Sequence, residues 1–467
     1  MKKFWLILLA LGLITAFSTQ ASAVDVKFSG DFYVAGMYLD KTDLRTDTTA
    51  HTGDGPSTAF FYQRLRLRTD FVVAPGLAFV TRADVMERVW GGKRATVATP
   101  AVADTASAQT GYENENIAFD WAYIQYDSSI GTFKVGYMDD LVWGTMFNDS
   151  ATPKGVIGWN YIMGQWNFIL KVIKTVDNSL TAINNTATNT DLDSDKYAAA
   201  VKYTWNSGEA GLLGAIYRDA TKRHTDTGVP ANSNYNAQYY GLLPYAKAQI
   251  GPVKIQAELD YIWGTWKDYE SGVLADQKLE NLGIFIDAVA DFNMFYAGGT
   301  LAYISGDDPS TYKAEGSPVV SGGLDWNPCL IMFNQDRTYW QGTLSGYDST
   351  SNASPISNAW FYQGRVGVRP TPKLDIMASV SFATADQRPY RDTGLNDHHG
   401  NDIMEANHGR DYGWEADVTA TYKITNNLSY MLGAGYLWTG NYYKGITVTD
   451  NELNDNYMLI NKLTLTF

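Results

Sequence analysis

The chain of 467 residues lacks several features that mark common protein classes. Its one cysteine, Cys329, excludes an internal disulfide and the cysteine-rich patterns that bind zinc or attach haem. Beyond the N-terminal region, no stretch reaches ~18 uninterrupted apolar residues, which excludes a protein that crosses a membrane with helices. Basic residues are too few to balance the acids, and the net charge of −14 argues against a nucleic-acid partner, whose phosphates would repel it.

The N-terminal region has the composition of an export signal. Lys2 and Lys3 precede an apolar run from Phe4 to Phe17, and Ala21-Ser22-Ala23 follows. This order of basic, apolar and small residues is typical of a secretory signal peptide with its cleavage site after the last alanine. The sequence therefore predicts a signal peptide over 1–23 and a mature protein over 24–467.

Alternation of apolar and polar residues dominates the rest of the chain. Val26, Phe28, Phe32 and Val34 fall on one face of the first expected strand, and the residues between them are mostly small or charged. Tyrosine, phenylalanine and tryptophan are abundant, with 31, 19 and 14 copies. Alternation with period two and aromatic enrichment together predict antiparallel strands with one apolar and one polar face.

The connections between these strands alternate between short and long. Short turns are expected near 74–76, 127–131, 163–165, 206–209, 251–252, 293, 370–372 and 425–427, and long segments near 41–57, 91–114, 139–155, 178–195, 223–238, 267–278, 307–358, 387–412 and 445–455. A soluble β-sandwich or propeller has no reason to alternate in this way. The sequence thus predicts an all-β, transmembrane, antiparallel up-and-down β-barrel of 18 strands, with 16 as the alternative, short periplasmic turns and long external loops.

Several motifs resemble Gram-negative outer-membrane porins. The ending Leu463-x-Leu465-x-Phe467 is similar to the terminal signal that the outer-membrane assembly machinery reads. Ala122–Tyr126 and Gly131–Tyr137 resemble the porin hairpin before the constriction loop, which places an infolded loop at about 139–155. Trp326–Phe333 is similar to a stretch of the abundant outer-membrane channels of metal-respiring deltaproteobacteria.

The resemblance implies a function and a location. It implies a water-filled channel in the cell outer membrane for passive diffusion of ions and small hydrophilic solutes, with no enzymatic activity and no cofactor. Outer-membrane lipid and the assembly machinery are the implied partners. Porins of this kind are often trimers, so it also implies a homotrimer.

The alternation also predicts which side chains line the pore. If Phe61, Leu65 and Leu67 face lipid, the arginines between them face the lumen, since a guanidinium in hydrocarbon costs ~2–4 kcal/mol. The predicted basic lining is Arg64, Arg66, Arg68, Arg82, Arg88, Arg365 and Arg369. The predicted acidic lining is Asp84, Glu258, Asp260 and Asp287 on strands and Asp139, Asp140 and Asp149 on or beside the infolded loop.

Two interpretations of this lining are open. A basic wall facing acids on the infolded loop would create a transverse field that biases ion passage. Alternatively, the arginines pair with acids as part of the wetted interior of any barrel.

Two loops suggest further features. The loop 307–358 has an apolar middle, so it either plugs or gates the pore or forms a folded external cap, and Cys329 within it is expected to be a small buried residue. All five histidines lie in expected loops, and His398, His399 and His408 are weak candidates for a divalent metal beside the alternative of a solvated polar loop.

Three other functions remain alternatives to a channel. The barrel could sheathe a partner such as an electron-transfer cytochrome, or the long loops could serve a surface structural or adhesive protein. An enzyme is disfavoured because the chain has no nucleophile elbow and no metalloprotease helix motif.

Overall fold

The computed structural model describes residues 24–46, 55–91, 117–147, 149–178, 191–223, 234–316, 322–352, 355–388, 390–396, 402–406, 409–445 and 452–467. The expected signal peptide and all five histidines, including the candidate metal ligands, lie outside the described residues.

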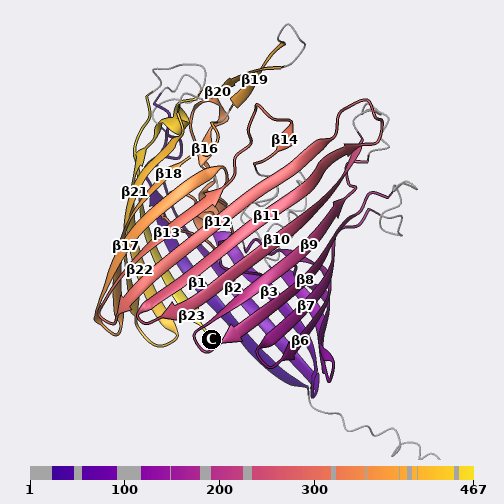
Figure 1. The fold of residues 1–467 in the computed structure, drawn as a ribbon. Helices are drawn as coiled ribbons and strands as arrows, with labels where there is room; N and C mark the ends of the chain where they lie inside the picture. Colours follow the sequence, from indigo (N-terminus) through magenta and orange to yellow (C-terminus); the bar gives the residue numbers. More distant parts are fainter. Residues whose placement is uncertain are drawn as a thin grey trace, which may run out of the picture.

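Within these residues, eighteen strands form one closed antiparallel wall (Figure 1). The first thirteen are β1 (Asp25–Leu39), β2 (Thr58–Ala74), β3 (Leu77–Val89), β4 (Ile117–Ser128), β5 (Gly131–Asp139), β6 (Pro153–Met163), β7 (Trp166–Val176), β8 (Ser194–Trp205), β9 (Gly208–Asp219), β10 (Tyr235–Ile250), β11 (Val253–Tyr269), β12 (Gln277–Phe292) and β13 (Phe295–Ile304). The last five are β17 (Ala359–Thr371), β18 (Leu374–Thr384), β21 (Asp411–Lys423), β22 (Leu428–Thr439) and β23 (Asn456–Thr466). β1 pairs with β2 on one side and with β23 on the other, which closes the barrel and confirms the larger of the two expected strand numbers.

Shorter elements lie in the long connections. They are β14 (Lys313–Ala314), α2 (Gln335–Gln341), β15 (Leu344–Ser345), η2 (Tyr347–Ser349), β16 (Ser351–Asn352), β19 (Tyr390–Asn396), β20 (Asp402–Ala406) and η3 (Asn441–Lys444). The side chain of Asn334 caps α2 by accepting a hydrogen bond from the Arg337 amide at 2.8 Å. Among the described residues, the helices are all too short or too polar to cross a membrane.

The two rims of the barrel differ as the sequence predicts. The eight expected short turns join neighbouring strands at the lower rim of Figure 1, and the longer connections rise from the upper rim. Gly164, Gly251 and Asn293 occupy three of the turns with positive φ angles of 60°, 60° and 67°, a conformation that glycine and asparagine tolerate best.

The wall separates apolar from polar side chains. Residues such as Phe28, Ile124, Leu170 and Val366 point outward and are exposed on the outer face. An outward apolar band of this kind is what strands need in order to contact lipid tails. Charged residues lie between them on the inner face.

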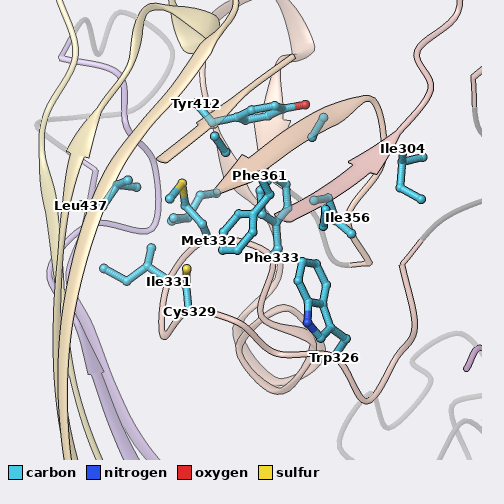
Figure 2. Close-up of a cluster of buried hydrophobic side chains, with 14 of the residues drawn as sticks. Ile304, Trp326, Cys329, Ile331, Met332, Phe333, Ile356, Phe361, Tyr412 and Leu437 are labelled. Carbon is cyan, nitrogen blue, oxygen red and sulfur yellow. The ribbon is translucent and has the colours of Figure 1, made fainter. Parts of the chain in front are cut away.

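The main hydrophobic cluster lies inside the barrel (Figure 2). Trp326, Met332 and Phe333, from the connection between β13 and β17, pack against Phe361 of β17 and Tyr412 of β21. The middle of this connection therefore fills part of the lumen.

Candidate functional site

Two connections enter the lumen, and the first follows β5. We call residues 140–147 and 149–152 the crossing loop. The indole Nε1 of Trp143 donates to the Leu243 carbonyl of β10 at 2.8 Å, and the Thr145 amide donates to the Glu258 carboxylate of β11 at 2.7 Å. Because β10 and β11 lie several strands away around the wall from β5, the loop crosses the interior.

The second is the lumen segment, residues 322–352. The Ile331 and Met332 amides donate to the two carboxylate oxygens of Glu415 on β21, at 2.6 and 2.7 Å. Asp336 forms an ion pair with Lys462 of β23 at 3.1 Å. These contacts hold the lumen segment against wall strands that come late in the chain.

The crossing loop and the lumen segment meet inside the barrel. The Leu324 amide donates to the Asp149 carbonyl at 3.1 Å, and the Gly323 amide donates to the Phe147 carbonyl. The Phe147 ring stacks on Phe285 of β12 with centroids 4.9 Å apart and meets Trp326 edge-on at 5.2 Å. The two connections therefore pack into a single unit, and we call the crossing loop and the lumen segment together the block.

A cavity of about 710 Å³ separates this block from the wall formed by β1 to β5, and we call it the charged opening. Tyr339, Trp340 and Val142 contribute apolar surface to its block side. The charged side chains that line it are Arg64, Arg66, Arg82, Asp84, Glu87, Asp120 and Asp139 on the wall and Asp149, Asp325 and Asp336 on the block.

Acids compensate the arginines of the wall. Arg66 donates from Nε and from a terminal nitrogen to the two carboxylate oxygens of Asp84, both at 2.7 Å. Such bidentate pairs are stronger than single hydrogen bonds between neutral groups. Arg82 pairs with Asp120 and, at 3.3 Å, with Asp139. The positive charges of Arg66 and Arg82 on the wall of the opening are therefore largely neutralised by neighbouring carboxylates.

The remaining wall arginine and an indole complete this side of the opening. Arg64 lies 3.8 Å from Asp31 and stands over the Tyr33 ring. The Arg82 guanidinium stands 3.8 Å from the centroid of the Trp121 ring, an arrangement that favours a cation by its attraction to the ring face. These contacts fix the direction of both side chains.

The block side of the opening is acidic. Asp336 has Lys462 as its partner, but in the part of the chain that the structure describes neither Asp149 nor Asp325 forms an ion pair. Burial raises the pKa of the Asp149 carboxyl, and the nearby Asp325 carboxylate raises it further. Loss of hydration is thus the main cause of the raised pKa, and repulsion between two acids on one side of a narrow space adds to it.

Several predicted pore-lining acids instead anchor the crossing loop. Asp140 is buried, pairs with Lys196 of β8 at 2.7 Å and accepts a hydrogen bond from the Thr152 amide. The neighbouring Lys196 ammonium lowers the pKa of Asp140 against the opposing effect of burial. Glu258 accepts the hydrogen bond from the Thr145 amide described above. Asp260 lies two residues further along β11 and is fully buried.

Other predicted residues lie inward but apart from the opening. Arg68 pairs with Asp70 at 2.8 Å, Arg365 with Asp287 at 2.7 Å, and Arg369 with Asp291 at 2.9 Å. The structure thus brings together Arg64, Arg66, Arg82, Asp84, Asp139 and Asp149 and leaves the other predicted strand pairs elsewhere on the wall.

Arg88 does not have its expected inward orientation. A β-bulge with Met86 at φ 52° inserts one residue into β3, so that Arg88 lies opposite Gln63 on the outer side of the sheet. The same shift turns Glu87 inward into the opening and Val89 toward the lumen cluster. An extra residue in one strand reverses the alternation beyond it.

Four acids of the opening are absent from the predicted set. Asp120 stands at a second irregularity, where Arg82 faces Trp121 and Ala83 already faces Phe119. Asp325 and Asp336 come from the lumen segment, and Glu87 from the β3 bulge. Strict alternation along a strand is the sequence signal that reveals inward residues. Bulges interrupt it at Glu87 and Asp120, and Asp325 and Asp336 lie outside the wall strands altogether.

Comparisons with known proteins concern the fold. No family model and no curated protein matches the chain. It is similar to the crystal structures of the outer membrane protein OpdK and of OccK9 (OpdG), both from Pseudomonas aeruginosa, at 12% and 13% identity and TM-scores of 0.45 and 0.49. A BenF-like porin from Pseudomonas fluorescens Pf-5 has 10% identity and a TM-score of 0.47. Each alignment covers 94% of this chain and 99% of the other.

Proposed function

We propose that this chain is an outer-membrane porin through which ions and small hydrophilic solutes diffuse passively. The observation that carries the proposal is the charged opening, which lies inside a closed wall that is apolar outside and polar inside. A barrel of 16–18 strands is wide enough to leave an aqueous channel. Loops that enter the lumen would narrow this channel. The crossing loop and the lumen segment do so here.

The charges of the opening support a preference for cations. Its lining contains three arginines and seven acids. Arg66 and Arg82 are paired with wall acids, while Asp149 and Asp325 face them from the block. Charge rings and charged constrictions bias which ions pass a pore. We propose Asp149 and Asp325 as the groups that attract cations and the arginines as the groups that limit this attraction.

The remaining features belong to the same proposal. We propose outer-membrane lipid as the surroundings of the apolar face, a homotrimer as the assembly, and no enzymatic activity or cofactor. Phe467, the residue proposed to be read by the assembly machinery, pairs with Gly30 of β1 through backbone hydrogen bonds of 2.9 and 3.0 Å. Because the stretch Trp326–Phe333 is similar to one in the outer-membrane channels of metal-respiring deltaproteobacteria, we also propose that this chain is related to those channels.

A sheath around a partner protein fits the interior less well. The lumen segment buries Trp326, Ile331, Met332 and Phe333 inside the wall and so occupies space that a partner would need. This favours a channel narrowed by its own chain.

Conductance in a planar bilayer tests the proposal. The folded protein should give steady single-channel currents, and a salt gradient should give a reversal potential with the sign of a cation-preferring pore. Correctly folded protein that gives no current would refute passive diffusion and favour the sheath. A reversal potential of the opposite sign would retain the channel and reject the roles given to Asp149 and Asp325.

A further inference from the structure

We propose that Cys329, Glu415 and Asp417 form a buried site for a divalent metal ion of the Zn²⁺ type. The sulfur of Cys329 and a carboxylate oxygen of each acid all lie within 4.8 Å of one another. Thiolate and carboxylate groups are both ordinary zinc ligands, and three protein ligands with one further position is a common zinc arrangement. This inference does not depend on the proposed channel function.

The three residues come from two sides of one internal contact. Glu415 and Asp417 are two residues apart on β21, so both point into the lumen. Cys329 comes from the lumen segment, where Figure 2 shows its sulfur within the packed interior. The exposed fractions are 3% for Cys329, 0% for Glu415 and 3% for Asp417. A metal bound here would join the lumen segment to the wall.

The polar atoms at this place are poorly satisfied. The carboxylate oxygens of Asp417 and the hydroxyl of Ser379 are buried and form no well-aligned hydrogen bond, although the Glu415 carboxyl, the Leu330 amide and the Ser379 hydroxyl lie close enough to act on the Asp417 carboxylate. Ser379 lies directly opposite Asp417 in the register of β18 and β21, so its hydroxyl is on the same inner face. Buried polar groups are normally well satisfied, and a cation would satisfy these oxygens better than such poorly aligned neighbours do.

A glycine leaves room for the carboxylates. A Cβ atom on Gly435 of β22 would lie 2.5 Å from a carboxylate oxygen of Asp417 and 3.4 Å from one of Glu415. A larger residue would therefore displace the carboxylates from the position at which they face Cys329.

The charge balance also favours a cation. Within the described residues neither Glu415 nor Asp417 forms an ion pair with lysine or arginine, and burying a carboxylate without a cation is costly. The amides of Ile331 and Met332 offset this cost for Glu415 alone.

The buried guanidinium of Arg337 donates to the carbonyls of Ile331 and Gly342. Arg365, which lies opposite Ser379 in the sheet, pairs with Asp287. A divalent ion would neutralise the acids, and a sulfur ligand selects Zn²⁺ over Mg²⁺ or Ca²⁺.

Cobalt substitution tests the site directly. The full chain, folded into detergent micelles with Co²⁺ present, should bind one equivalent and show the near-ultraviolet absorption of a cobalt–thiolate bond. Zn²⁺ should displace the cobalt and abolish the band. Because the chain has one cysteine, the band reports Cys329 alone, even if the histidines of the loops also bind metal.

Two variants and a control decide the outcome. Cys329→Ser should remove the thiolate band, and Asp417→Asn should weaken binding by about tenfold or more. Glu209→Gln, which changes an inward acid on β9 that pairs with Lys202, should leave the band and the affinity unchanged. Folded wild-type protein without the band, or with a band that Asp417→Asn leaves at full affinity, would overturn the proposal and indicate that the two acids share a proton instead.

Discussion

Removal of the Phe147 side chain should loosen the block that narrows the lumen. Phe147 is fully buried and lies between Phe285 of β12 and Trp326 of the lumen segment, so it joins three parts of the interior. Replacing a buried phenylalanine by alanine costs about 3–5 kcal/mol. Since each ~1.4 kcal/mol corresponds to a factor of ten, the ratio of docked to undocked crossing loop should fall by roughly two to three and a half orders of magnitude.

Single-channel recording of Phe147→Ala should show this loosening. We expect a larger mean conductance and frequent transitions between current levels, because the far part of the crossing loop then keeps the hydrogen bonds of Trp143 and Thr145 to β10 and β11 but loses the packing of the Phe147 ring. Phe28→Ala is the matched control, since that ring lies on the outer face with 62% exposure and should leave the current unchanged. A Phe147→Ala protein that is fully folded and conducts exactly as wild type would refute the role of the block in setting pore size.

Three further predictions concern the charges of the opening. Arg66→Gln should shift the reversal potential further toward cations and, because Asp84 loses two hydrogen bonds of 2.7 Å, should lower the free energy of unfolding by roughly 1–3 kcal/mol in denaturant titrations. The double variant Asp149→Asn, Asp325→Asn should shift the reversal potential toward anions, and a potential equal to that of wild type would remove both acids from the selectivity mechanism. Burial, and then the nearby Asp325, raises the pKa of Asp149, so this acid takes up its proton at a higher pH than an ordinary aspartate. The cation preference of the wild type should therefore decline as the pH falls through that range. A cation preference that does not change with pH in the wild type and that the double variant also shows would contradict this assignment.

The wall could be predicted from the sequence because its constraints are local. Each strand alternates with period two, and the short turns contain residues such as Gly251 and Asn293 that tolerate positive φ. The inward orientation of Arg64, Arg66 and Arg82 followed from the cost of placing a guanidinium in hydrocarbon.

The site could be predicted only in part because its remaining constraints are not local. The bulge at Met86 has no compositional mark, yet it exchanges the orientations of Glu87 and Arg88. Asp325 and Asp336 reach the opening because the lumen segment docks on β21 and β23, which follow it in the chain by about a hundred residues. Pairing between arginines and wall acids likewise depends on strand register, which alternation alone does not specify.

The pairing of β1 with β23 has a consequence for the order of assembly. The closing seam joins residues such as Gly36 and Asn461, which are 425 positions apart. The chain therefore loses the entropy of closing this loop only when nearly all of it is present. Contacts of such high sequence separation make folding slow. The anchor of the lumen segment at Lys462 is on the same last strand, so a nascent chain that lacks β23 has neither a closed wall nor a fully anchored interior.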